Sequence, residues 1–261
     1  MAIPKVIHYC WFGGKELPDQ VKECIESWKK CCPDYEIIRW DESNFDYRKY
    51  AFTKDAYDAK KWAFVSDVAR LDIVYHHGGI YLDTDVELLH SLDLFLENQA
   101  FMGFEQGRKV ATGLGFGAEK GNLVIKANLD AYKTISFSAN SRNIDEIACP
   151  IITTTVLEHM GLNRKDMLQE LEGVTIYPTS VFCPMLFSDG TADVQEDTIS
   201  IHHYAATWTN EEEKQKFRKR IAIYTKYGKT GLSIYDGFVL LREKGIGSFL
   251  KRIFEKITKF N

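Results

Sequence analysis

The sequence predicts an α/β protein with a mostly parallel, Rossmann-like sheet flanked by helices, followed by a basic helical tail. Strand-like and helix-like segments alternate through the first half of the 261 residues, an order typical of parallel sheets covered on both faces. A pair of glycines separates the longest predicted helix from the strand after it. The tail is indicated by the concentration of lysine and arginine near the C-terminus.

The first half begins with a β-prone run over residues 5–12, which ends at Gly13-Gly14. A helix is predicted over residues 19–30 because apolar residues recur there at helical spacing. Pro33 ends this helix, and residues 35–40 form the second predicted strand. The apolar residues of the helix are Val21, Cys24, Ile25 and Trp28.

The longest predicted helix runs from about residue 55 to 76 and ends at Gly78-Gly79. Its apolar stripe consists of Phe64, Val68, Leu71 and Tyr75. Asp67 and Arg70 are three residues apart and flank this stripe, so both are expected near its buried edge. The pair has two interpretations: a structural ion pair, or two groups that hold a polar ligand.

Two carboxylates follow the next predicted strand, residues 80–83. Because strand side chains alternate between faces, Asp83 and Asp85 are expected to leave the strand on the same side. Two hard oxygen ligands suit Mg²⁺ or Mn²⁺ and leave coordination positions for substrate phosphates. Ligands of such sheets bind beyond the carboxyl ends of the strands, which places Trp11 and Trp40 around the same crevice. The pattern therefore favours a site that handles a diphosphate.

The composition, 45% hydrophobic and 13% aromatic residues, is that of an ordinary soluble globular protein. No run approaches the roughly 20 apolar residues of a membrane span, and the N-terminus lacks the pattern of a secretory signal. We therefore expect a cytoplasmic protein whose six cysteines are reduced thiols.

The net charge of −4 is unevenly divided. Residues 1–213 carry 20 Lys/Arg and 34 Asp/Glu, which gives −14, whereas residues 214–261 carry 13 Lys/Arg and three Asp/Glu, which gives +10. This division favours a main domain over residues 1–210 and a basic helical extension over residues 211–261. An anionic membrane surface is the partner that such an extension favours, and the sequence shows no nucleic-acid recognition motif. Residues 247–261 are amphipathic, so they either lie in a membrane interface or dock on the core.

Three segments, residues 7–14, 66–70 and 78–85, resemble successive motifs of the DXD-containing sugar transferases. They are most similar to the capsular-polysaccharide and initiating-mannosyltransferase-like enzymes of glycosyltransferase family 32. The same order of blocks resembles the glucosyltransferase domains of large clostridial toxins. The resemblance covers about residues 3 to 97 and resumes more loosely at residues 112–119, 177–184 and 202–208.

The resemblance implies a GT-A fold and a retaining transfer of a hexose from a nucleotide-diphosphate sugar. The expected catalytic residues are Asp67, Arg70, Asp83 and Asp85. Asp67 and Arg70 would hold the hydroxyl groups of the donor sugar and the diphosphate side. Asp83 would bind the ribose and a metal-bound water, and Asp85 would ligate the metal directly.

The resemblance also implies where the nucleotide binds. Trp11 would stack on the base, and Tyr9 is expected among the same cofactor-binding residues. UDP is favoured as the nucleotide because Trp11 resembles a uracil-stacking position. The expected cofactors are therefore Mn²⁺ or Mg²⁺ and a UDP-hexose.

Residues 202–208 resemble the closing segment of the family, in which one side chain completes the metal sphere and a tryptophan shields the leaving phosphate. Trp208 is the expected tryptophan. His203 is assigned as the third metal ligand, with Asp83 and Asp85, by its distance from Trp208 along the sequence, and His202 is the alternative. A nitrogen ligand favours Mn²⁺ over Mg²⁺.

The expected function is metal-dependent transfer to a glycan or lipid-linked sugar acceptor, in the synthesis of a surface polysaccharide (such as a capsule) or glycolipid at the inner face of the cell membrane. A bound cation would neutralise the charge that builds on the leaving diphosphate. No carboxylate in the sequence can be identified as a nucleophile, which favours front-face attack over double displacement.

Two alternatives remain open. A haloacid-dehalogenase-like phosphohydrolase also places Asp-x-Asp after a strand, but it needs Thr or Val where Glu87 stands. A nucleotide-sugar or glycan-binding module would share the motifs without turnover.

Overall fold

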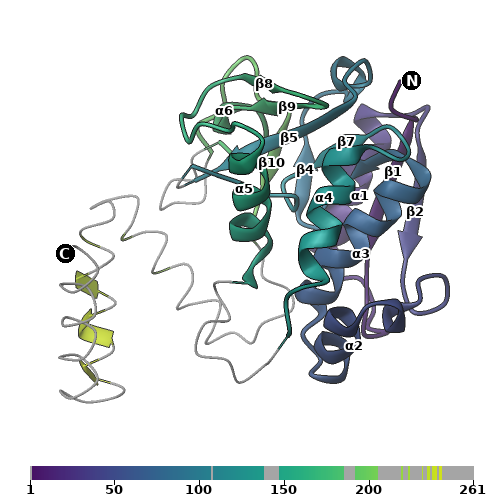
Figure 1. The fold of residues 1–261 in the computed structure, drawn as a ribbon. Helices are drawn as coiled ribbons and strands as arrows, with labels where there is room; N and C mark the ends of the chain where they lie inside the picture. The colour runs from purple at the N-terminus through teal and green to yellow at the C-terminus, as the bar shows by residue number, and fades with distance from the viewer. Residues whose placement is uncertain are drawn as a thin grey trace. The chain divides into compact units, whose positions relative to one another are not determined.

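The computed structural model describes residues 2–106, 108–137, 147–184 and 192–204, together with residues 219, 223, 231, 234, 235, 237–239, 241 and 242. The chain forms two compact units, one of Met1–Leu186 with Ala192–Trp208 and one of Phe187–Thr191 with Thr209–Asn261. The first unit contains the sheet (Figure 1). The elements in chain order are β1 (Val6–Cys10), α1 (Asp19–Cys31), β2 (Glu36–Trp40), η1 (Tyr47–Lys49), α2 (Ala51–Asp58), α3 (Trp62–His77), β3 (Gly79–Tyr81), β4 (Val86–Leu88), η2 (Asp93–Phe95), β5 (Ala100–Glu105), β6 (Lys109–Val110), β7 (Phe116–Ala118), α4 (Leu123–Tyr132), α5 (Cys149–His159), β8 (Gln169–Leu171), β9 (Val174–Tyr177), α6 (Thr179–Phe182) and β10 (Ser200–His202).

The main sheet has the strand order β2-β1-β3-β7-β5-β9-β8, with β6 paired to β5. β1 pairs in parallel with β2 and β3, and β5 pairs in parallel with β9. β7 is antiparallel to both β3 and β5, so β3 and β5 point in the same direction. β4 and β10 form a separate antiparallel pair. The predicted α/β class is confirmed, although the antiparallel β7 in the middle of the sheet was not predicted.

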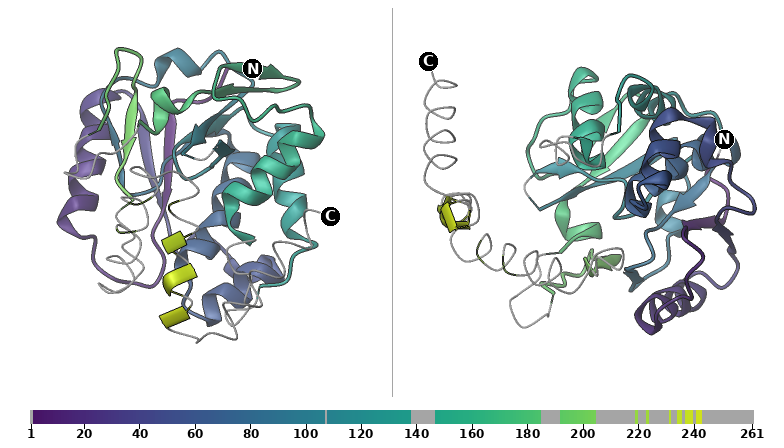
Figure 2. Two further views of the ribbon diagram at one scale, coloured as in Figure 1. Left: turned by 90° about the vertical axis from the view of Figure 1, so that its left-hand side faces the viewer. Right: turned by 90° about the horizontal axis from the view of Figure 1, so that it is seen from below.

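Helices cover both faces of the sheet, as predicted. Trp28 of α1 packs in one apolar cluster with Phe101 of β5, on the face that also carries β4. Val68 of α3 and Ile125 of α4 belong to a second apolar cluster, on the opposite face. In the left view of Figure 2, α1 (purple) lies on one side of the strands and α4 (teal) on the other. The carboxyl ends of β1 and β3 therefore lie between two packed helical layers.

The prediction of one helix over residues 55 to 76 is wrong, because the segment contains two helices, α2 and α3. Lys60 adopts a left-handed conformation with φ 56°. Its N–H donates to the carbonyl of Tyr57 at 2.8 Å, and the N–H of Lys61 donates to the carbonyl of Ala56 at 2.9 Å. These two bonds form a Schellman motif, which ends α2 without the glycine that usually marks such a stop.

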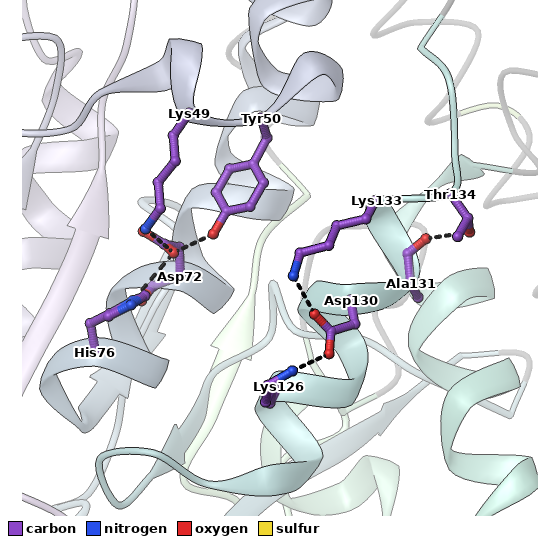
Figure 3. Close-up of polar contacts among 9 residues, drawn as sticks. All are labelled: Lys49, Tyr50, Asp72, His76, Lys126, Asp130, Ala131, Lys133 and Thr134. Carbon is purple, nitrogen blue, oxygen red and sulfur yellow. Dashed lines mark hydrogen bonds and ion pairs between the residues drawn. The ribbon is translucent and has the colours of Figure 1, made fainter.

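The end of α3 is at Gly78, as predicted, where φ is 72°. Farther back on this helix, the buried carboxylate of Asp72 accepts hydrogen bonds from Lys49 Nζ at 2.8 Å and from Tyr50 OH at 2.5 Å (Figure 3). His76 Nδ1 lies 3.2 Å from the same carboxylate and 2.8 Å from the backbone carbonyl oxygen of Asp72. Asp72 therefore ties α3 to η1 and α2, and we assign it a structural role.

His8 in the middle of β1 predicts an acid-sensitive fold. It is 1% exposed, its Nε2 lies 2.9 Å from the carbonyl oxygen of Gly78, and its Nδ1 accepts from Trp40 Nε1 at 3.1 Å. The neutral ring satisfies both contacts, whereas a proton on Nδ1 would face the indole N–H. Burial accordingly lowers the pKa of His8 to about 4.

Because the unfolded chain takes up a proton at His8 below about pH 6.5 and the folded chain does so only near 4, acid favours unfolding. The free energy of unfolding should fall by about 3 kcal/mol between pH 6.5 and 4 relative to His8→Gln, which has no such proton to bind. Urea unfolding of both proteins across this pH range measures the difference. If the difference in free energy of unfolding between the wild type and His8→Gln stayed constant across this pH range, the lowered pKa of His8 would be contradicted.

Three predicted features lie outside the described residues: Trp208, the amphipathic segment 247–261, and the boundary between residues 210 and 211. Within the described part of the chain, none of the helices combines the length and the apolar character needed to cross a membrane.

Candidate functional site

The two aspartates are brought together by a turn. β3 ends at Tyr81, and the N–H of Asp83 donates to the carbonyl of Gly113 at 3.3 Å. The N–H of Val86 then donates back to the carbonyl of Asp83 at 3.0 Å. Asp83 therefore begins a tight turn between β3 and β4, and Asp85 lies within it. Their convergence was predicted, but the reason given was wrong, since strand alternation plays no part in it.

A histidine joins the two aspartates. The ligand atoms of Asp83, Asp85 and His202 all lie within 4.8 Å of one another, and His202 Nε2 is 3.3 Å from Asp85 Oδ1. Two atoms that each bind one ion at about 2.1 Å and at right angles are about 3 Å apart. The other ring nitrogen, His202 Nδ1, is buried and makes no hydrogen bond within the part of the chain that the structure describes. The donor set therefore fits an Mn²⁺ or Mg²⁺ ion.

His203, the ligand preferred from the sequence, points elsewhere. Its Nε2 lies 2.8 Å from Glu87 Oε2, and its N–H donates to the carbonyl of Asp85 at 3.0 Å. β10 pairs antiparallel with β4, with His202 opposite Val86. Neighbouring residues of an extended segment face opposite sides, so His202 and His203 point away from each other, His202 to the aspartates and His203 to Glu87. The assignment to His203 disagrees with this geometry, and the alternative, His202, agrees with it.

The Asp67–Arg70 pair lies directly beside the aspartates. Arg70 Nη2 is 3.1 Å from Asp67 Oδ1 and 3.2 Å from Asp83 Oδ1, and its side chain is 4% exposed. Tyr81 OH donates to the same Asp83 oxygen at 3.0 Å. The interpretation as a structural ion pair agrees with this geometry, because Arg70 is a buried cation that also fixes Asp83. That the pair holds a polar ligand stays a prediction.

Burial shapes the protonation of these groups. It raises the pKa of Asp67 to about 6, against the opposing charge of Arg70. It also raises the pKa of Asp83, with a further contribution from the charge of Asp85. Burial alone would lower the pKa of His202, but the carboxylate of Asp85 raises it overall. Burial is the largest cause of both raised aspartate pKa values, and a divalent cation at the cluster would favour the charged forms of these carboxylates.

Gly113 brings backbone close to the site. A Cβ atom at this position would lie 2.3 Å from Asp83 Oδ2 and 3.2 Å from Arg70 Nη1. No side chain fits there, so the segment before β7 passes directly beside the aspartate.

The aromatic residues predicted around the site separate into two groups. Trp11 follows β1 at the same sheet edge, with its indole N–H on the carbonyl of Lys15 at 2.7 Å. Tyr9 is 8% exposed and packs edge-on against Trp28 at 5.7 Å, so its side chain belongs to the core rather than to a cofactor site. The indole N–H of Trp40 donates to His8 Nδ1 at 3.1 Å, so this side chain is held by β1. Trp11 is therefore the predicted aromatic residue that the structure leaves at the edge.

Sequence patterns missed the groups that hold the charged residues in place. Arg70 Nη1 lies 3.9 Å from Cys149 Sγ, and the N–H and thiol of Cys149 hydrogen-bond Asp67. Tyr81 was counted as a strand residue only, although its hydroxyl binds Asp83. No local signal marks Cys149, because α5 meets α3 only in the folded chain.

Residues 18–102 match the family model described as a glycosyltransferase sugar-binding region containing a DXD motif. Inositol phosphoceramide mannosyltransferase 3 of Schizosaccharomyces pombe is 37% identical over 109 residues, which are 39% of this chain and 29% of that protein. Mannosyl phosphorylinositol ceramide synthase SUR1 of Saccharomyces cerevisiae is 32% identical over 104 residues, 38% of this chain and 27% of that protein. The chain thus spans less than a third of the length of these relatives.

The fold is also similar to a solved structure, the PaToxG glycosyltransferase. The similarity covers 60% of this chain and 70% of that one, at 21% sequence identity and a TM-score of 0.50. The matched region of the family model contains Asp67, Arg70, Asp83 and Asp85. Over residues 18–102 the chain is therefore similar to the sugar-binding region of the DXD-containing glycosyltransferases, and its fold is of the GT-A type.

Proposed function

We propose that this chain is a divalent-metal-dependent, retaining glycosyltransferase that moves a hexose from a nucleotide-diphosphate sugar to a glycan or lipid-linked acceptor. The observation that carries the proposal is the convergence of Asp83, Asp85 and His202 at the carboxyl edge of the sheet, inside and beside the matched sugar-binding region. A cation there would offset the charge that builds on a departing diphosphate.

The metal ligands in this proposal are Asp85, His202 and Asp83, the last directly or through water. Mn²⁺ is favoured because one ligand is a nitrogen. Arg70 and Tyr81 hold one oxygen of Asp83 in place, so this carboxylate is fixed before the donor arrives. Such preorganisation avoids reorientation during the reaction.

The donor binds between Trp11, at the edge of the sheet, and the Asp67–Arg70 pair. Trp11 stacks on the base, which favours UDP, and Asp67 accepts hydrogen bonds from hydroxyl groups of the sugar. The side chain of Asp67 is 11% exposed, so it can touch a ligand while Arg70 remains behind it. Attack comes from the front face, with a leaving phosphate oxygen accepting the proton of the acceptor hydroxyl.

A donor panel tests the proposal. UDP- and GDP-linked glucose, galactose, N-acetylglucosamine and mannose should be incubated with the chain and MnCl₂, and released nucleotide measured with and without EDTA. Mannose belongs in the panel because one relative is named a mannosyltransferase and the other a mannosyl phosphorylinositol ceramide synthase. Nucleotide release that requires Mn²⁺ supports the transferase. Release of inorganic phosphate would indicate a phosphohydrolase, and binding without release would indicate a binding module.

The acceptor proposed is a lipid-linked sugar or glycolipid, in surface polysaccharide or glycolipid synthesis at the inner face of the cell membrane. The named substrate of the relatives, inositol phosphoceramide, is a lipid, and residues 214–261 carry an excess of ten positive charges, 13 basic minus three acidic residues. The basic extension would then hold the enzyme at an anionic membrane surface.

Removing residues 247–261 should weaken binding to vesicles of phosphatidylglycerol and phosphatidylcholine by at least about 10-fold, since each Lys or Arg contributes about 1 kcal/mol at an anionic surface. Sedimentation with the vesicles measures this, and donor hydrolysis should persist. A full-length control replaces Lys251, Arg252, Lys256 and Lys259 with glutamine. Unchanged vesicle binding together with loss of solubility would instead show that the segment packs on the core.

A further inference from the structure

Glu105 at the end of β5 is a carboxylate that no sequence motif explains. β5 points in the same direction as β3, with β7 between them, so Glu105 ends at the same sheet edge as the turn of Asp83 and Asp85. Neighbouring strands are about 4.8 Å apart, which places β5 about 10 Å from β3. This separation is comparable to the width of one sugar ring with its hydroxyl groups.

The face on which Glu105 lies is set by strand alternation. Phe101, Gly103 and Glu105 share one face of β5. Phe101 stacks on Phe182 of α6, with ring centroids 5.7 Å apart, and a Cβ at Gly103 would lie 2.7 Å from Phe182 Cδ2. α6 therefore covers this face only as far as Gly103. The next residue in the row is the half-buried Glu105.

The groups around this carboxylate belong to the wall of the metal site. Glu105 interacts electrostatically with His202, with Tyr204 and with Cys183. The ring of Tyr204 lies edge-on to that of His202, with centroids 4.2 Å apart, and its hydroxyl is 3.0 Å from Cys183 Sγ. Within the described ranges no ion pair closer than 4.0 Å neutralises Glu105; the cation that acts on it across the strand pair is Lys109 of β6.

Glu105 is thus a poor structural residue. A half-buried carboxylate without a close cation costs stability, and its partial burial raises the pKa of Glu105 to about 7. Folds tolerate such a group where it acts on a ligand.

We propose that Glu105 is a further substrate-binding residue, whose carboxylate accepts a hydrogen bond from a sugar hydroxyl group beside the metal cluster. The inference rests on the proposed glycosyltransferase function and adds to it a specificity-determining contact from the second half of the fold. The hydroxyl belongs either to the transferred hexose or to the acceptor sugar. The chemistry is the same in both cases, and kinetics can separate them.

The experiment uses the full chain with Glu105→Ala, which removes the acceptor group, and Glu105→Gln, which keeps its shape but not its charge. Glu170→Gln on the exposed face of β8 is the matched control. Donor hydrolysis without acceptor, transfer to acceptor, Mn²⁺ binding by titration calorimetry and melting temperature are measured for each. A charge-assisted hydrogen bond predicts a loss of kcat/KM of about 10- to 100-fold for Glu105→Ala, a smaller loss for Glu105→Gln, and no loss for the control.

The two sources of the hydroxyl give different patterns. If the donor sugar supplies it, the KM of donor hydrolysis rises without any acceptor present. If the acceptor supplies it, donor hydrolysis stays at the wild-type rate and the KM for the acceptor rises. Either pattern, with Mn²⁺ affinity unchanged and a melting temperature for Glu105→Gln no lower than that of the wild type, supports the proposal.

Three outcomes overturn it. Wild-type kinetics in both Glu105 variants would show that the carboxylate touches no sugar, with the transferase function intact. Parallel loss of Mn²⁺ affinity and activity would show that Glu105 acts through His202, and melting temperatures lowered in both variants would show a structural role. A wild-type chain that releases nucleotide from no donor would refute the proposed function itself, and this inference with it.

Discussion

Replacing Asp85 with asparagine is expected to abolish Mn²⁺-dependent sugar transfer while the protein still folds. Asp85 lies with Asp83 and His202 in the cluster whose ligand atoms fall within 4.8 Å. Loss of one anionic ligand removes the cation that offsets the leaving diphosphate, an effect worth several kcal/mol, so the rate should fall by roughly 10³-fold or more. Nucleotide release from the active donor and the circular dichroism spectrum measure the two parts of this prediction.

Mn²⁺ binding by two histidine variants shows which histidine binds the metal. His202→Ala should weaken Mn²⁺ binding by at least about 10-fold, because even groups outside the ligand sphere change metal affinity by 10- to 100-fold. His203→Ala should leave the affinity close to that of the wild type, since His203 binds Glu87. The reverse order of effects would restore the assignment made from the sequence.

Asp130→Asn is the control for this series. Asp130 lies on α4, where Lys126 and Lys133 bind it (Figure 3), and it takes no part in the cluster. Its substitution should leave both transfer and Mn²⁺ affinity unchanged. Sugar transfer at the wild-type rate in Asp85→Asn would refute the proposed metal site.

Replacing Arg70 with methionine is expected to have the largest effect on stability. The guanidinium is 4% exposed and lies between Asp67 and Asp83, at 3.1 and 3.2 Å. Methionine keeps part of the packing but leaves the buried carboxylate of Asp67 and the partly exposed one of Asp83 without their cation, which should lower the free energy of unfolding by about 3–5 kcal/mol. Urea unfolding monitored by tryptophan fluorescence measures the change.

The exposed pair of Arg164 and Glu158 provides a matched control, with side chains 48% and 37% exposed. Arg164→Met should cost less than about 1 kcal/mol, as is usual for surface ion pairs. Asp67→Asn added to Arg70→Met should recover part of the lost stability, because it removes one uncompensated charge. If Arg70→Met and Arg164→Met lowered the free energy of unfolding equally, burial of the Asp67–Arg70–Asp83 group would not determine its contribution to stability.

Comparison of the predicted and observed elements shows where local signals suffice. The helix of Asp19–Cys31 buries Val21, Cys24, Ile25 and Trp28, the residues chosen for their spacing. The stop at Gly78 was recognised because few other residues adopt its positive φ without cost. The break between α2 and α3 was missed, because a lysine occupies the left-handed position and apolar residues continue on both sides of it.

The sequence by itself determined the α/β class, the Asp-x-Asp turn and the neighbouring Asp67–Arg70 pair, because each depends on residues close together in the chain. Tertiary structure decided which histidine faces the aspartates, since Glu87 and His203 are 116 positions apart and the pairing of β4 with β10 sets their faces. It also decided that Tyr9 packs in the core and that Glu105 ends beside the site. Such choices depend on strand register and on which element covers which face, and these arise only when distant segments pack.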